Sequence, residues 1–163
     1  SDDMTDSRLE ALRGTRLATE LTDRQAEALA EVLTLRDLKA GDVLVQEGTT
    51  DNHLYVIVKG VLGVVKNAGT PEALTLHTLS AGDFVDELGF LDGTPYYASK
   101  VAMSDLRVLG LARERLEAML HEHPELVYRV MRAIVRVAHQ IQRRLSMQQT
   151  ELSNYIYKQH GRY

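Results

Sequence analysis

The adjacent carboxylates Asp86-Glu87 stand where an extended run, Phe84-Val85, breaks into a short apolar turn. The first backbone N–H groups of a helical turn have no partner inside the turn, so they can bind an anion or a ligand hydroxyl. An Asp at the same place can instead cap the turn with its own side chain. The sequence therefore predicts either a ligand site or a self-capped turn here, and Glu87 can serve as a ligand acceptor or as a structural carboxylate.

The histidines do not form a pattern typical of a metal site. Cupin enzymes, which have a β-roll shape, need His-x-His with a Glu and a further His on paired strands, whereas His53 and His77 stand singly in separate segments. His121-x-His123 ends a predicted helix, and no other residue supports haem ligation by His77. The sequence also has no P-loop, dinucleotide fingerprint or Gly-x-Ser-x-Gly motif. We expect no metal and no catalytic residues, and a cupin-like enzyme is the weakest interpretation.

Composition limits the remaining classes of function. The chain has 163 residues, 44% of them apolar, which is enough for one domain with a hydrophobic core. A net charge of -4 gives no basic surface for nucleic acid, and the absence of cysteine excludes disulfides and zinc–thiolate sites. No apolar run has the length of a membrane span, and no signal peptide is visible, so we expect a cytoplasmic protein with no membrane contact.

Short β-type runs separated by glycine-containing turns occupy the middle of the chain. Residues 1–16 are polar and mixed and are left unassigned, and Thr22-Asp23-Arg24-Gln25 has the pattern of a capping box before an amphipathic helix over 22–33. The predicted strands follow at 43–47, 54–58, 61–65, 73–77, 97–102 and 106–111. Their spacing of about ten residues favours an antiparallel jelly roll, so we expect a mainly β fold with flanking helices.

Two helices are predicted after the last strand. A short helix is predicted at 113–121, and Pro124 occupies the favoured first position of a much longer one. Along this helix, residues at alternating steps of four and three form a heptad seam: Val127, Met131, Ile134, Ala138, Ile141, Leu145, Gln148, Leu152 and Tyr155. A seam longer than its own domain needs a partner, and a second copy is the simplest one. We therefore expect a homodimer, with an interface of Met131, Ile134, Ala138, Ile141, Leu145, Gln148 and Leu152. The alternative is that the helix folds back over the β domain, and both can hold if its first turns do so.

An ordered series of glycine-centred turns resembles the cyclic-nucleotide-binding domain. The series consists of Gly41-Asp42-x-Leu44-x-x-x-Gly48, Leu54-Tyr55-x-Ile57-x-x-Gly60-x-Leu62 and Leu79-x-x-Gly82-Asp83-Phe84-x-x-Glu87-Leu88. It looks most like the sensor half of the cAMP-receptor/FNR class of bacterial transcription factors. The resemblance implies a β-roll followed by a short helix and a long dimerisation helix.

The resemblance also implies a phosphate-binding cassette, in which a Gly and a Glu open a short helix and an Arg followed by Ser or Thr pairs with the phosphate. Glu87 and Leu88 match this pattern, but Asp86 replaces the Gly, Tyr96 stands in place of the Arg, and Tyr97 in place of Ser/Thr. Loss of a bidentate Arg–phosphate contact argues against binding of cAMP or cGMP. The tyrosines suit a neutral or aromatic ligand, or they fill the volume of an abandoned pocket.

The resemblance places a ligand between the cassette and the long helix. The expected contacts are Val85, Asp86, Glu87, Leu88, Tyr96, Tyr97, Gln148 and Gln149, with Gln148 equally able to set the register of the helix pair. Lys100 could partly supply the missing positive charge, but strand alternation from Tyr96 gives it no assured aim.

The preferred interpretation is a non-enzymatic regulatory sensor that signals through ligand-biased dimer geometry. Its effector would be a cyclic nucleotide or another small molecule, and no cofactor is certain. The alternative is a degenerate module that acts only in dimerisation or protein–protein contact. We divide the chain into a polar segment (1–16), a β-roll (17–123), the long helix (124–157) and a tail (158–163). No DNA-binding domain follows the helix in this chain, so it is either a sensor half with a winged helix elsewhere or a protein that acts through a partner.

Overall fold

The computed structural model describes residues 2–160, without the side chains of residues 2, 88, 159 and 160. It confirms the mainly β fold with flanking helices. The elements are α1 (Asp2–Arg13), a 3-10 turn η1 (Arg16–Ala18), α2 (Asp23–Val32), β1 (Thr34–Leu38), β2 (Val43–Val45), β3 (His53–Lys59), β4 (Leu62–Lys66), β5 (Leu74–Leu79), β6 (Phe84–Val85), α3 (Glu87–Asp92), β7 (Ser99–Ala102), β8 (Leu106–Ala112), α4 (Arg113–Ala118) and α5 (Pro124–His160). Residues 161–163 of the expected tail lie outside the described residues.

Two four-stranded antiparallel sheets form the β-roll. One has the strand order β1-β8-β3-β6 and the other β2-β7-β4-β5, so every sheet pairs strands that are distant in the sequence. The predicted glycine turns join these strands. Gly60, for example, has φ 96°, and a Cβ there would overlap the carbonyl oxygen of Asp105. Only glycine satisfies both conditions, so this turn was readable from the sequence.

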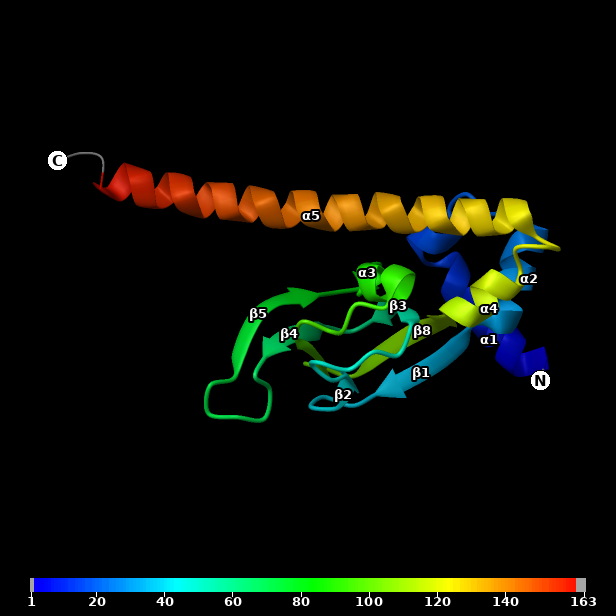
Figure 1. The fold of residues 1–163 in the computed structure, drawn as a ribbon, viewed down its shortest axis with the longest axis horizontal. Helices are drawn as coiled ribbons and strands as arrows, with labels where there is room; N and C mark the ends of the chain where they lie inside the picture. Colours follow the sequence, from blue (N-terminus) through cyan, green and yellow to red (C-terminus); the bar gives the residue numbers. More distant parts are fainter. Residues whose placement is uncertain (1, 161–163) are drawn as a thin grey trace.

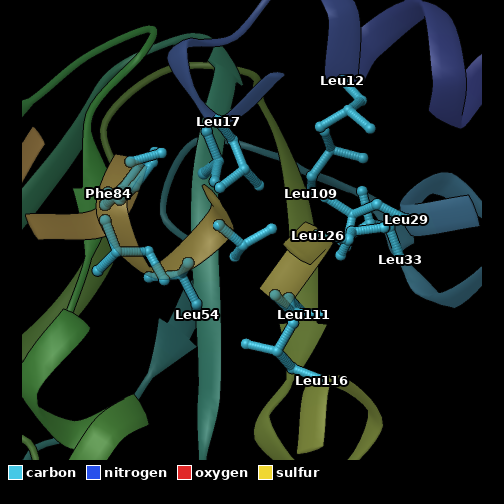
Figure 2. Packing of buried hydrophobic residues seen from close by; sticks show 14 of the residues in the cluster. Leu12, Leu17, Leu29, Leu33, Leu54, Phe84, Leu109, Leu111, Leu116 and Leu126 are labelled. Atoms are coloured by element: carbon cyan, nitrogen blue, oxygen red, sulfur yellow. The ribbon is translucent and has the colours of Figure 1, made fainter. Parts of the chain in front are cut away.

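The N-terminal helices close one end of the roll. The capping box at Thr22 is formed as predicted: the Thr22 hydroxyl accepts from the backbone N–H of Gln25, whose side chain accepts from the N–H of Thr22. The segment that we left unassigned contains α1, whose Leu12 is fully buried. Figure 2 shows Leu12 and Leu17 packed with leucines of α2, β8 and the start of α5 in one apolar cluster.

Helix α5 runs without interruption from Pro124 to His160, which is about 55 Å at 1.5 Å per residue. Its first turns pack on the roll through Leu126, Val130 and Val137, and its C-terminal half continues past α3 and over the β4–β5 hairpin (Figure 1). The alternative that the helix folds back over the β domain therefore holds for its first turns, whereas its later turns extend beyond the hydrophobic core.

One predicted interface residue is wrong. Ile134 is 1% exposed and packs in the core of its own chain, as does Val127 of the predicted seam. The roll covers the centre of the predicted seam. The heptad positions that stay uncovered keep every second residue of that seam and replace each of the others by the next residue in the chain. A heptad stripe with the exposed or half-buried side chains follows this shifted path: Tyr128, Met131, Val135, Ala138, Gln142, Leu145, Gln149, Leu152 and Ile156.

Candidate ligand-binding site

Asp86 begins α3 in a left-handed conformation. Its φ is 56° and its ψ 57°, a region that glycine adopts freely and that Asp tolerates better than most residues. One carboxylate oxygen accepts from the backbone N–H of Gly89 at 3.3 Å, so the expected cap is formed. The same carboxylate lies so close to Gly89 that a Cβ there would overlap it. The turn is therefore self-capped, and Asp86 also lines the neighbouring cavity.

A cavity of about 600 Å³ lies between the roll, α3 and α5. This volume is within the range of small-molecule sites, roughly 300–1,000 Å³. Its lining from the roll and α3 consists of Val64, His77, Leu79, Phe84, Asp86, Glu87, Tyr97 and Lys100, and its lining from α5 of Ala138, Ile141, Gln142, Leu145, Ser146 and Gln149. The cavity therefore has one wall from the β-roll and one from the long helix.

The structure brings together half of the predicted ligand contacts. Asp86, Glu87, Tyr97 and Gln149 line the cavity. Val85 does not, because its side chain is fully buried in the core of the roll. Gln148 does not line the cavity but a separate surface hollow, together with Arg144 and Glu151. Of the two predicted glutamine contacts, only Gln149 lines the cavity. The side chain of Leu88 lies outside the described residues.

Tyr96, which stands in place of the cassette arginine, is not among the residues that line the cavity. It is 3% exposed, and its hydroxyl donates a short hydrogen bond to Asp51. Tyr55 donates to the other oxygen of the same carboxylate at 2.8 Å. Burial and the Asp51 carboxylate both raise the pKa of Tyr96 and of Tyr55, so both phenols stay protonated and neutral. The structure therefore places the Tyr96 ring in the core of the roll and not in the cavity wall where its ligand contact was expected.

The sequence did not show whether the side chain of Lys100 points toward the cavity. Val64 pairs with His77 of β5 on one side and with Lys100 of β7 on the other, so the three side chains lie on one face of the sheet, toward the cavity. Alternation counted from Tyr96 could not show this, because β7 begins only at Ser99 and the chain bends before it. The direction of the Lys100 side chain follows from the register of β7 against β4.

Burial shifts the pKa of four ionisable groups of the cavity. It raises the pKa of Glu87, with the neighbouring Asp86 charge adding to the effect, and it raises the pKa of Asp86. It lowers the pKa of Lys100, which the two carboxylates partly oppose. It also lowers the pKa of His77, and the charges of Lys100 and Arg144 act in the same direction. Clusters of perturbed groups in a cavity are typical of functional sites.

Next to the cavity, Asp83 ties α5 to the roll. This carboxylate is 2% exposed and accepts from the backbone N–H of Ser80 at 2.9 Å. It forms ion pairs with Arg144 of α5 at 3.2 Å and with Arg16 of η1 at 3.4 Å. The sequence gives no local signal for the contact with Arg144, because the two residues are 61 positions apart in the chain.

Over residues 2–160, no group of three or more His, Cys, Asp or Glu side chains is placed to hold a metal ion. Within the same range, no helix is both long and apolar enough to cross a membrane.

Comparison with known proteins identifies the family. Residues 35–123, more than half of the chain, match the family model described as "Cyclic nucleotide-binding domain". The chain belongs to the cyclic nucleotide-binding domain family. Its fold is similar to a crystallised cyclic nucleotide-binding domain from Methylobacillus flagellatus, with a TM-score of 0.73 and 22% identity over 88% of this chain and 80% of that one.

Two curated relatives of this cyclic nucleotide-binding domain are similar over parts of their length. "Pycsar effector protein BcPycTIR" of Burkholderia cepacia is 44% identical over 61 residues, which are 37% of this chain and 20% of that protein. A "CRP-like cAMP-activated global transcriptional regulator" of Mycobacterium tuberculosis is 23% identical over 109 residues, which are 67% of this chain and 49% of that protein. The match therefore spans one fifth of the first and about half of the second.

Proposed function

We propose that this chain is a non-enzymatic sensor domain that binds a nucleotide-type or nucleoside-type small molecule and transmits its presence through α5. The observation that carries the proposal is the shared cavity. Glu87 of α3 and Gln149 of α5 line it from opposite elements, so a single ligand would contact both. Family membership supports this role, because the matched family is a regulatory ligand-binding domain.

The chemistry of the lining favours a polar ligand with hydroxyl groups. Glu87 presents a half-buried carboxylate, which accepts hydrogen bonds from hydroxyls. Gln149 and Ser146 offer both donors and acceptors from α5, and Tyr97 offers an exposed aromatic face at the rim. Leu79, Phe84 and Ile141 supply apolar surface for a ring system. A nucleoside unit, with its hydroxylated sugar and flat base, satisfies these groups together.

The signal would pass through the position of α5. A ligand shifts a conformational equilibrium only if it binds one arrangement more tightly than the other. Contacts to Gln149 and Ser146 exist only while α5 lies against the roll, so a bound ligand would favour the docked helix. The ion pair between Asp83 and Arg144 supports the same arrangement without ligand.

We further propose that the stripe from Tyr128 to Ile156 pairs with its counterpart in a second copy of the chain. Leu152 is 59% exposed and continues an apolar heptad pattern into turns that the roll does not cover. Because Ala138, Leu145 and Gln149 belong to both the stripe and the cavity, a ligand would influence how the two helices pair.

The names of the relatives support a nucleotide-type ligand. The M. tuberculosis protein is named as cAMP-activated and as a transcriptional regulator. Titration calorimetry tests the proposal with four 3′,5′-cyclic nucleotides and the four corresponding nucleosides, which share base and sugar. Binding of at least one compound, weakened by Glu87→Gln and by Gln149→Ala, supports a site between the two elements. Failure of all eight to bind would contradict the proposal.

A module without a ligand is the second candidate, and the position of Tyr96 favours it. Its ring occupies the interior beside the cassette and its hydroxyl is held by Asp51, which closes the place of the family arginine. Such a module would act only in dimerisation. This second candidate predicts that the chain sediments as a stable dimer and that no compound changes how its two helices pair.

A further inference from the structure

A second cavity of about 580 Å³ lies between α1, η1, β3 and the β5–β6 turn. It shares no lining residue with the cavity next to α5, so the two are separate places. Small residues leave this space open, because Ala11 and Gly14 line it from the N-terminal segment and Ala81 and Gly82 from the turn. Its volume is within the range of small-molecule sites, roughly 300–1,000 Å³.

Charged residues of both signs line the second cavity. Glu10 of α1 is negative and exposed, and Arg16 of η1 and Arg107 of β8 are positive. Among the described residues Glu10 forms no ion pair, whereas each arginine has a carboxylate partner outside the cavity. Opposite charges therefore line the same space without pairing with each other.

Both arginines keep N–H donors for a further partner. Arg107 uses Nε and Nη2 for Asp37, at 2.7 and 3.0 Å, which leaves both N–H groups of Nη1. Arg16 uses Nη1 for Gln140 and Nη2 for Asp83 and a backbone carbonyl, which leaves its Nε–H. These bonds already hold the two guanidinium groups in place, so binding a carboxylate costs little side-chain entropy.

The charges around the second cavity favour a ligand with one charge of each sign. Arg107 has its own carboxylate partner, but Arg16 and Arg144 share Asp83, so those three residues carry one positive charge in excess. Glu10 adds one negative charge to the lining. A purely anionic ligand is repelled by Glu10, and a purely cationic ligand is repelled by the arginines.

We infer that the second cavity binds a free amino acid with an apolar side chain. Its carboxylate accepts hydrogen bonds from Arg16 Nε and Arg107 Nη1, its ammonium group donates to Glu10, and its side chain lies against Val58 and Ala11. The inference goes beyond the proposed function and does not depend on nucleotide binding. It gives the domain a second small-molecule site, on the side of η1 where Arg16 also contacts α5 through Gln140.

An amide NMR titration of the full chain with leucine, phenylalanine and methionine tests the inference. Each amino acid is paired with the acid that lacks its ammonium group and with the amine that lacks its carboxylate. We expect at least one amino acid to bind about fivefold more tightly than its acid and its amine, a modest factor because the charged groups are exposed to water. The shifted amides should cluster in residues 7–16 and 81–82.

Charge-removing variants locate the two ends of the ligand. Glu10→Gln should weaken the amino acid about fivefold and strengthen the acid, because it removes the partner of the ammonium group and the repulsion of the carboxylate. Arg107→Met should weaken both compounds. The matched controls Glu27→Gln and Arg115→Met change exposed residues of α2 and α4 outside the cavity and should leave both affinities unchanged.

An acid that binds as tightly as its amino acid would overturn the inference, as would failure of all three amino acids to bind. Equal affinity of wild type and Glu10→Gln for the amino acid would also overturn it. The proposed function is tested separately by calorimetry with nucleotides and nucleosides, and it stands in each of these cases, because the two cavities share no lining residue.

Discussion

Asp83 of the β5–β6 turn and Arg144 of α5 join the β-roll to the middle of the long helix by an ion pair of 3.2 Å. The pair is adjacent to the candidate cavity, because Phe84 follows Asp83 and lines that cavity. Arg16 contacts the same carboxylate at 3.4 Å, so η1 and α5 are fixed to one point of the roll. Beyond the apolar packing of its first turns, the middle of α5 is therefore held on the roll by ion pairs next to the place where a ligand would act.

Replacing Asp83 by Asn should loosen α5. The substitution removes the buried negative charge that both arginines contact, and we expect a loss of about 1–3 kcal/mol in the free energy of unfolding. Urea denaturation measures this loss, and hydrogen exchange should become faster in residues 138–149. Asp105→Asn is the control, since Asp105 is exposed and its side chain makes no contact with α5. Equal stability of the two variants would show that the ion pairs do not hold the helix.

Glu87 should destabilise the fold at neutral pH. Burial raises its pKa above the ordinary 4.5, so the charged form is disfavoured in the folded chain. The penalty is fully present above the raised pKa and is lost as the pH falls toward 4.5. Glu87→Gln should thus be more stable than wild type at pH 7, and its advantage should shrink as the pH falls to 5.

Urea denaturation at several pH values checks this prediction, with the exposed Glu122→Gln as the control. An advantage of Glu87→Gln that is constant with pH would show that the Glu87 carboxylate does not titrate with a raised pKa.

The shifted stripe of α5 should mediate self-association. Leu152→Asp puts an unpaired charge into the apolar stripe, which should weaken the dimer at least about a hundredfold at an estimated cost of about 3 kcal/mol. Met147→Asp is the control, because Met147 is equally exposed but lies on another face of the helix. Sedimentation velocity measures both, and thermal unfolding of monomeric Leu152→Asp should show an intact roll.

Ile134→Asp should behave differently from Leu152→Asp. Its side chain is buried in the core of its own chain, so the charge should unfold the domain rather than only separate two copies. A folded monomeric Ile134→Asp would contradict the corrected position of the stripe. A wild-type chain that sediments as a monomer at high concentration would contradict the dimer itself.

Asp86→Gly should increase the affinity for a monoanionic ligand. Glycine adopts the left-handed conformation of this position without strain, and the change removes a carboxylate from the cavity. Two like charges about 4 Å apart repel by about 4 kcal/mol at an effective dielectric near 20, which corresponds to a gain in affinity of up to about a thousandfold. Calorimetry with a cyclic nucleotide measures it. Unchanged affinity would mean that Asp86 serves only as the cap of α3.

Much of the fold could be predicted from the sequence because its signals are local. The capping box at Thr22, the proline at the start of α5 and the glycine turns each depend on a few neighbouring residues. The first strand and α1 were not predicted, since their apolar residues pack against distant segments and give no clear period.

The site was only half predictable for the same reason. Asp86 and Glu87 are marked by the turn that contains them, but the direction of Lys100 depends on the register of β7 against β4. The heptad pattern of α5 was visible, yet its phase could not be chosen, because the side that the roll covers is a tertiary property. Tyr96 was assigned to the ligand although Asp51, far away in the chain, holds its hydroxyl.

Hydrogen exchange across the cavity tests the central claim most directly. The full chain is compared with and without a saturating amount of the compound that binds best in calorimetry. If one ligand contacts both walls, exchange slows both in residues 86–91 of the cassette and in residues 138–149 of α5. Protection of the cassette alone, with unchanged exchange in α5, would contradict transmission of the signal through the long helix.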